Sequence, residues 1–286
     1  MIAAALKTAR GGRARLGIFT ILVRRRRGGT LFVMASGTRT WGLRRAGDGP
    51  LVVGHRGASA RAPENSVEAF ARARADGADG VELDVLQCAS GEVVVFHDDD
   101  LVRLGSRPER IDTLTLAELR NIELRGGARI PTLEEAFEAC GPELLVNVEL
   151  KAAMLGGRRI AALVDGVAQA LARAGAAPRV LVSSFNPRAV RLWMRRLPAV
   201  PAALLFERAE VTPLRRAWAA KWLRPAALNP ELVLCTPARV ARWRGLGYAV
   251  NVWTVDGAAA VRACRDMHVD GIITNDPGAS RLTLEP

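Results

Sequence analysis

From Leu51 onward, short apolar runs rich in β-branched residues alternate with longer segments whose apolar positions recur at helical spacing. Most of the short runs lack a regular alternation of apolar and polar residues, which is typical of strands covered on both faces. The candidate strands are Leu51–Gly54, Gly80–Leu86, Val93–His97, Leu144–Leu150, Val180–Ser184, Ala202–Phe206, Ala226–Leu228, Ala249–Thr254 and Gly271–Thr274.

Helical segments lie between most of these strands. Two of them start with the spacing of a capping box, Thr115 to Glu118 and Thr132 to Glu135. Asn65 precedes the candidate helix Ser66–Ala75. The remaining candidate helices are Gly157–Arg173, Arg188–Arg196, Pro213–Trp222, Pro237–Arg244 and Ala258–Met267.

The second and third candidate strands are separated only by Gln87 to Glu92, with Ser90-Gly91 at the centre. A crossover helix does not fit there, so the two strands should form a hairpin. Eight strands then remain, each with room for a crossover before the next. This pattern predicts an α/β fold, a closed (β/α)₈ TIM barrel with a β-hairpin arm after the second barrel strand. An open doubly wound sheet is the alternative, but no Gly-rich phosphate loop follows the first strand.

Composition divides the 286 residues into two parts. With 49% hydrophobic and 24% charged residues, the chain is typical of a globular protein. The formal charge is +12, yet residues 1–50 hold eleven Lys and Arg and one acid, so the rest carries only about +2. We therefore expect residues 1–48 to be a disordered basic extension and residues 49–286 to be the barrel.

The basic extension contains two apolar stretches, Leu16–Val23 and Leu31–Met34, which are too short to span a membrane. Arg24 to Arg27 stand where a signal peptide would need small residues. A disordered tail, or residues upstream of a true start at Met34, is the favoured interpretation. The alternatives are weak contact with an anionic membrane surface and nucleic-acid contact by charge alone; no nucleic-acid partner is expected. The four cysteines are widely spaced singles, which favours reduced thiols in a cytoplasmic protein.

Candidate chemistry gathers at the ends of the first strands. His55 and Arg56 follow the first strand, and His97 ends the hairpin arm. Glu82 and Asp84 are two residues apart in the second strand, so both should face the barrel mouth. The third histidine, His268, falls at a helix end and is expected to be structural.

Glu149 and Lys151 share one face at the end of the strand that follows, together with Asn147. Three converging carboxylates, Glu82, Asp84 and Glu149, suit Mg²⁺ or Ca²⁺ rather than zinc. Arg56 and Lys151 suit an anionic phosphate. With His55 and His97 as acid and base, this set predicts cleavage of a phosphoester.

The motifs, taken in order, resemble those of the glycerophosphodiester phosphodiesterase family, within the phospholipase-C-like phosphodiesterase superfamily. The matching segments are His55-Arg56-Gly57, Pro63-Glu64-Asn65, Glu82-Leu83-Asp84, Phe96-His97-Asp98, Glu149-Leu150-Lys151, Ser183-Ser184-Phe185, Val252-Trp253-Thr254-Val255 and Asp270 to Pro277.

The resemblance implies a TIM barrel that hydrolyses small-molecule glycerophosphodiesters to glycerol 3-phosphate and an alcohol. It implies acid–base roles for the two histidines, divalent metal binding by the three carboxylates, and phosphate binding by Arg56 and Lys151. Phe185 and Trp253 would line the glycerol pocket. The implied route is attack by the glycerol 2-hydroxyl, which gives a cyclic phosphate that water opens.

Two alternatives stay open. One is a lysophospholipase D or sphingomyelinase-D-like activity on lipid substrates, which would use the same groups. The other is a non-catalytic module whose basic N-terminus docks on an anionic surface.

Overall fold

The computed structural model describes residues 14–16, 19–25, 31–35, 40–44, 48–152, 155–210 and 217–285. The chain forms two units, Met1–Thr40 and Trp41–Pro286. In the first unit, β1 (Ala14–Leu16), β2 (Phe19–Arg25) and β3 (Leu31–Ala35) pair as an antiparallel sheet in that order. Much of residues 1–48 lies outside the described residues, so the expected disordered extension stays a prediction.

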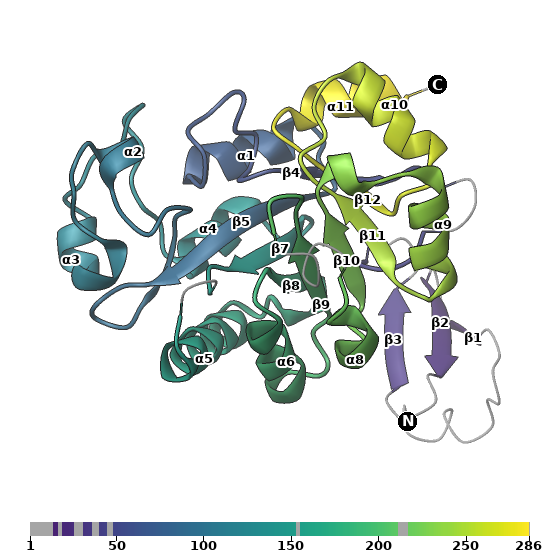
Figure 1. Cartoon of the computed structure of the whole chain (residues 1–286), viewed down its shortest axis with the longest axis horizontal. Helices are drawn as coiled ribbons and strands as arrows, with labels where there is room; N and C mark the ends of the chain where they lie inside the picture. Colours follow the sequence, from purple (N-terminus) through teal and green to yellow (C-terminus); the bar gives the residue numbers. More distant parts are fainter. Residues whose placement is uncertain are drawn as a thin grey trace. The chain divides into compact units, whose positions relative to one another are not determined.

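The second unit is a closed barrel of eight parallel strands (Figure 1). Its first strand, β4, pairs in parallel with β12 on one side and β5 on the other, which closes the ring. Closure confirms the predicted TIM barrel and excludes an open sheet. The barrel strands are β4 (Leu51–Gly54), β5 (Gly80–Gln87), β7 (Leu145–Leu150), β8 (Val180–Ser184), β9 (Ala202–Phe206), β10 (Ala227–Pro230), β11 (Ala249–Val252) and β12 (Gly271–Thr274).

The predicted hairpin arm is also present. Strand β6 (Val93–Val95) runs antiparallel to β5, with Val95 opposite Val85. It ends two residues before the predicted limit at His97. The next residue, Phe96, still donates its backbone N–H to the Asp84 carbonyl at 3.0 Å. His97 is therefore held directly beyond the carboxylate-bearing end of β5.

Helices surround the barrel, and their apolar faces pack against the outward side chains of the strands. Leu83 and Val85 of β5, for example, share a buried cluster with Val164 and Val167. The helices of the described residues are α1 (Val67–Ala75), α2 (Val102–Gly105), α3 (Leu116–Leu119), α4 (Leu133–Cys140), α5 (Gly157–Ala174), α6 (Pro187–Arg196), α8 (Ala220–Leu223), α9 (Pro237–Gly245), α10 (Ala258–Asp266) and α11 (Pro277–Leu284). Single 3₁₀ turns are η1 (Ile111–Thr113), η2 (Ala177–Arg179) and η3 (Leu232–Leu234).

The local start signals are confirmed at two helices and corrected at a third. Both predicted capping boxes form, at Thr115 for α3 and at Thr132 for α4. Helix α1 is capped by Ser66 instead of Asn65. Asn65 has a left-handed backbone, and its side chain turns inward to Asp84. Part of the predicted helix Pro213–Trp222 lies outside the described residues.

The end of the barrel that holds the strand N-termini is filled by apolar side chains. Leu51, Val53, Leu145 and Ile273 form one inner cluster, and Leu181, Ala203, Ala227 and Ala249 form a second. Trp41 packs against both clusters, and its indole N–H donates to the Arg179 carbonyl at 3.0 Å. The opposite end therefore remains available for polar groups.

Two other expectations can be compared with the described part of the chain. Cys88, Cys140, Cys235 and Cys264 form no disulfide, and all but Cys235 are buried. Among the helices described, none combines the length and the hydropathy that a bilayer span requires.

Candidate active site

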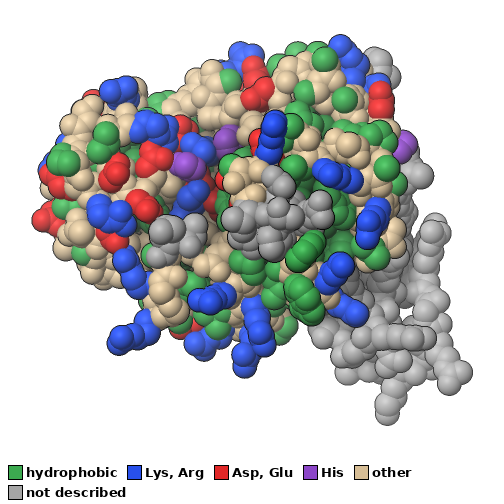
Figure 2. All heavy atoms as spheres, in the orientation of Figure 1, with side chains coloured by type: hydrophobic (Ala, Val, Ile, Leu, Met, Phe, Trp, Pro, Cys, Tyr) green, Lys and Arg blue, Asp and Glu red, His purple; other side chains and the backbone are tan. Residues whose placement is uncertain are grey.

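A pocket of about 410 Å³ opens at the C-terminal ends of the barrel strands. It brings together eight of the nine predicted site residues, and the ninth, Asp84, lies buried at 1% exposure. On the face of the molecule in Figure 2, histidine side chains lie among acidic and basic ones. The lining residues are His55, Arg56, Glu82, His97, Asn147, Glu149, Lys151, Phe185, Leu205, Glu207, Glu210, Trp253 and Ile273.

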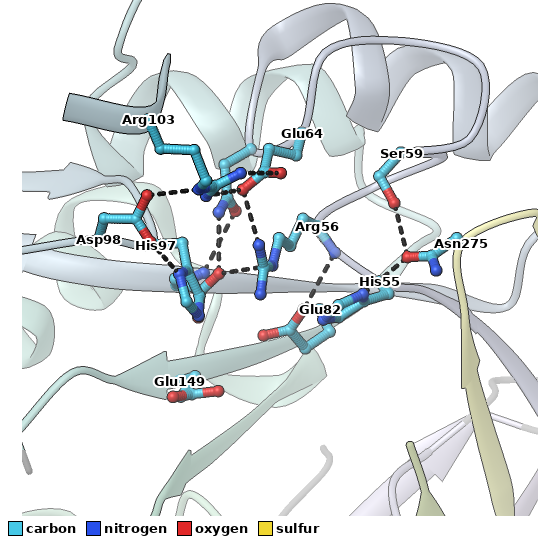
Figure 3. A network of polar contacts seen from close by, with 12 residues as sticks. His55, Arg56, Ser59, Glu64, Glu82, His97, Asp98, Arg103, Glu149 and Asn275 are labelled. Atoms are coloured by element: carbon cyan, nitrogen blue, oxygen red, sulfur yellow. Dashed lines mark hydrogen bonds and ion pairs between the residues drawn. The ribbon is translucent and has the colours of Figure 1, made fainter. Parts of the chain in front are cut away.

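The imidazole of His55 is held by Asn275, the residue that follows the last barrel strand. Its Nδ1 lies 2.7 Å from Oδ1 of Asn275 (Figure 3). The Asn275 Nδ2 donates to Asp256 at 2.6 Å. Since the amide N–H group is used by Asp256, the Asn275 oxygen must accept, and the neutral His55 carries its proton on Nδ1. The Nε2 atom is left with a free lone pair, as a general base requires.

His97 is oriented by a charged partner instead. Its Nδ1 lies 2.6 Å from Asp98 Oδ1, and Asp98 Oδ2 accepts from Arg103 Nε at 2.6 Å. A carboxylate beside Nδ1 stabilises an imidazolium more than a neutral amide does. The two histidines thus have different environments: a neutral partner for His55 and an anionic partner for His97.

The pKa values of both histidines are lowered from their ordinary value. For His55 the largest cause is burial, followed by the positive charge of Arg56. For His97 burial is again the largest cause, while Asp84 and the hydrogen bond to Asp98 oppose it. Burial thus reduces the protonated fraction of both imidazoles, and only His97 has an anionic partner that favours its protonated form.

Glu64 connects Arg103, the partner of Asp98, with Arg56. It accepts two hydrogen bonds from Arg103, at 2.7 and 2.8 Å, and one from Arg56 at 2.7 Å. In Figure 3, Arg56 lies between the two imidazoles, with Glu64 above it. Although burial opposes the shift, the two guanidinium groups keep the pKa of Glu64 below its ordinary value. The Arg56 side chain is thus fixed at the centre of the site.

Glu82, Asp84 and Glu149 form a buried acidic cluster below the histidines. One carboxylate oxygen from each lies within 4.8 Å of the others. Burial, and then the neighbouring carboxylates, raise the pKa of Glu82 well above its ordinary value. Burial of Glu149 raises its pKa to about 7, although the positive charge of Lys151 opposes this shift. Burial and the neighbouring carboxylates therefore disfavour the charged forms of Glu82 and Glu149.

Asp84 is the carboxylate of the cluster that the protein itself stabilises. It accepts from Asn65 Nδ2 at 2.8 Å, and Arg56 Nε and Lys151 Nζ lie 3.3 and 3.4 Å from its oxygens. Burial would raise its pKa, but Lys151, His97 and Arg56 lower it overall. Asp84 is thus ionised and ready to bind a cation.

The cluster fits a hard divalent cation. Its donors are carboxylate oxygens, two of which have raised pKa values in the absence of a metal, and a cation would relieve their mutual repulsion. No cysteine lines the pocket, and both pocket histidines have Nδ1 partners of their own. A divalent metal ion could therefore bind between Glu82, Asp84 and Glu149.

Aromatic side chains form another wall of the pocket. Phe185, after β8, and Trp253, after β11, meet edge to face with ring centroids 5.6 Å apart. The Trp253 indole N–H donates to the Asn229 carbonyl at 2.8 Å, which fixes the ring. This wall offers an apolar surface opposite the charged groups.

Several residues of the site received no role from the sequence. Asn275, Asp98 and Glu64 stand inside recognised motifs, so their place in those motifs was a usable signal. Glu207 and Glu210 line the pocket without any such motif. His268 lies outside the pocket, and its backbone carbonyl accepts from Arg244.

Comparison with known proteins agrees with this geometry. The model of the glycerophosphoryl diester phosphodiesterase family matches residues 55–279. A glycerophosphodiester phosphodiesterase of Caldanaerobacter subterraneus subsp. tengcongensis is 34% identical over 239 residues, which cover 79% of this chain and 94% of that protein.

Solved structures show the same fold. A glycerophosphodiester phosphodiesterase of Parabacteroides distasonis superposes with a TM-score of 0.71 at 27% identity, covering 82% of this chain and 96% of that one. A phosphodiesterase of Oleispira antarctica, solved with the product sn-glycerol-3-phosphate, superposes with a TM-score of 0.74 at 24% identity, covering 83% and 98%. The family match and these relatives together show that this chain belongs to the glycerophosphoryl diester phosphodiesterase family, whose members are phosphoric diester hydrolases.

Proposed function

We propose that the protein hydrolyses glycerophosphodiesters to sn-glycerol 3-phosphate and an alcohol, in a reaction that depends on Mg²⁺ or Ca²⁺ and on two histidines. The observation that carries the proposal is the convergence of both imidazoles, two cations and three buried carboxylates on one pocket. A relative with this fold binds sn-glycerol-3-phosphate, the product named here.

His55 is assigned as the general base of the first step. Its Nδ1–H is held by the neutral Asn275 amide, and burial together with the positive charge of Arg56 disfavours its protonated form. Nε2 can therefore take the proton of the substrate's attacking 2-hydroxyl, as a new P–O bond forms to a cyclic phosphate.

His97 is assigned as the general acid. The Asp98 carboxylate supports its imidazolium, which can pass the Nε2 proton to the leaving alcohol oxygen as the old P–O bond breaks. Water then opens the cyclic phosphate, with the roles of the two imidazoles exchanged. Each histidine returns to its starting protonation state.

Arg56 and Lys151 hold the phosphate. Both side chains are kept charged, since nearby carboxylates raise the pKa of each despite burial, which opposes the shift. A bound divalent cation would add further stabilisation of the negative charge that develops on the phosphate oxygens. Phe185 and Trp253 provide a wall against which the carbon chain of the glycerol can pack.

The test is direct assay of the purified protein with glycerophosphocholine and glycerophosphoethanolamine, each with Mg²⁺, Ca²⁺ or EDTA. We expect sn-glycerol 3-phosphate to be released in the presence of a metal and not with EDTA. Lysophosphatidylcholine is assayed in parallel, and faster turnover of that lipid would favour a lysophospholipase D. Absence of glycerol 3-phosphate with every metal would refute the proposal.

A further inference from the structure

Asn147 is a buried polar residue of the pocket that the proposed reaction does not use. It lies on β7 directly opposite Glu82 and two residues before Glu149, so it faces the barrel interior beside the acidic cluster. The side chain lines the pocket, and the residue is 1% exposed. Neither its Oδ1 nor its Nδ2 has a hydrogen-bond partner among the described residues.

Such an arrangement is unusual in a protein interior. Buried amides are nearly always paired, because each lost hydrogen bond to water must be replaced. The residues on either side of Asn147, Val146 and Val148, are apolar and fully buried. If position 147 served only to fill the barrel, an apolar side chain of similar size would do so at lower cost.

Another buried asparagine in the barrel provides a contrast. Asn229 on β10 is 0% exposed, and its Nδ2 also has no partner. However, its Oδ1 accepts from Asn251 at 3.0 Å, and Asn229 does not line the pocket. Of these two residues, therefore, only Asn147 lines the pocket and has both ends of its amide without a partner.

The two ends of an amide require opposite partners. Oδ1 needs a cation or a hydrogen-bond donor, and Nδ2 needs an electron-rich acceptor such as a phosphate oxygen. The acidic cluster of Glu82, Asp84 and Glu149 attracts the first kind of partner, and Arg56 and Lys151 attract the second. A cation and a phosphate bound side by side would satisfy the whole amide.

We propose that Asn147 is a fourth protein group of the cation site. Its Oδ1 acts as an oxygen ligand of the divalent cation held by the three carboxylates, and its Nδ2 donates a hydrogen bond to a phosphate oxygen. Amide oxygens are common ligands of Ca²⁺ and complete sites in which carboxylates are too few. This inference rests on the proposed metal-dependent function and adds a residue to it.

Isothermal titration of the intact protein with Mg²⁺ and with Ca²⁺ tests the proposal without an activity readout. Asn147→Ala should weaken the affinity for the cation about tenfold or more. Asn147→Asp keeps an oxygen ligand and should bind the cation at least as tightly as the wild type. The matched control Asn229→Ala removes a buried barrel amide elsewhere and should leave the cation affinity unchanged.

A second titration, with sn-glycerol 3-phosphate at saturating Mg²⁺, tests the Nδ2 donor. Asn147→Ala and Asn147→Asp should both bind this anion about tenfold more weakly than the wild type. Melting temperatures without metal establish that each variant is folded. If Asn147→Ala does not fold, Asn147→Ser, which shortens the side chain but stays polar, takes its place with the same expectation.

The possible failures are distinguishable. Wild-type protein that binds no divalent cation would overturn the metal-dependent function, and this inference with it. Wild-type binding that Asn147→Ala retains in full would overturn only the role of Asn147. Equal weakening by Asn147→Ala and Asn229→Ala would assign both residues to the packing of the barrel and would also refute the proposal.

Discussion

Nδ1 of His55 lies 2.7 Å from Oδ1 of Asn275, a residue 220 positions later in the chain. The contact exists because β4 and β12 are neighbours in the closed barrel, with Gly54 opposite Thr274. It directs the lone pair of His55 Nε2 away from Asn275 and determines which nitrogen can act as a base.

Replacing Asn275 should therefore slow the chemical step. Without the acceptor, His55 can adopt the wrong tautomer, so we expect Asn275→Ala to lower kcat by about 10- to 100-fold with little change in KM. Steady-state kinetics on glycerophosphocholine measures the effect. Ser59→Ala is the control, since Ser59 donates to the same Asn275 oxygen at 2.9 Å without holding the imidazole. A comparable loss in both variants would contradict the tautomer argument.

Removing either histidine should abolish most activity and leave the cation site intact. We expect His55→Asn and His97→Asn each to reduce kcat by about 10²- to 10⁴-fold, the usual contribution of a general acid or base. Affinity for Mg²⁺, measured by calorimetry, should remain near that of the wild type. His268→Asn is the matched control, because His268 lies outside the pocket and asparagine tolerates its φ of 57°.

Replacing Glu82 by a neutral residue should change the melting temperature differently without metal and with metal. Burial and the neighbouring carboxylates raise the pKa of Glu82, so Glu82→Gln removes repulsion and should leave the metal-free melting temperature equal or higher. The increase in melting temperature on adding Mg²⁺ should shrink, because one ligand is lost. The control is Glu109→Gln, because Glu109 is a partly exposed acid paired with Arg107 and lies outside the pocket, so its metal response should match the wild type. An undiminished metal response in Glu82→Gln would exclude Glu82 from the site.

The pairing of Glu64 predicts a pH-dependent loss of stability. Its folded pKa is lowered, so its carboxylate contributes stability that is present above its unfolded pKa and lost as pH falls through the folded value. Glu64→Gln should therefore cost roughly 1 kcal/mol at pH 7, with the difference shrinking at acid pH. Urea unfolding at several pH values checks both the sign and the range. A difference that grows on acidification would contradict the assignment.

Trp41 should matter for stability rather than for catalysis. It packs against both inner apolar clusters and does not line the pocket. Because Trp41 is only partly buried, we expect Trp41→Ala to lower the free energy of unfolding by roughly 2 kcal/mol, less than a fully buried tryptophan would lose. Urea unfolding measures the loss, while kcat at 25 °C should stay near that of the wild type. Trp222→Ala is the control, because Trp222 is 78% exposed.

Much of the architecture followed from local patterns in the sequence. The order of strands and helices, the short Gln87 to Glu92 connection and the shared face of Glu82 and Asp84 all depend on spacing along the chain. These features could be predicted because strand period, crossover length and capping are properties of neighbouring residues. The motif series also identified the family.

The partners of the site residues were decided by the tertiary structure alone. The Asn275 acceptor for His55, the contact of Arg103 with Glu64, and the unpaired amide of Asn147 depend on how separate elements are arranged. No local pattern encodes them, because they depend on the register with which β12 meets β4 and on where the loops fold over the mouth. The sequence by itself determined which chemical groups reach the mouth of the barrel. Only closure of the barrel decided which nitrogen, oxygen and charge each group presents to the pocket, because those contacts form between residues that are distant in the chain.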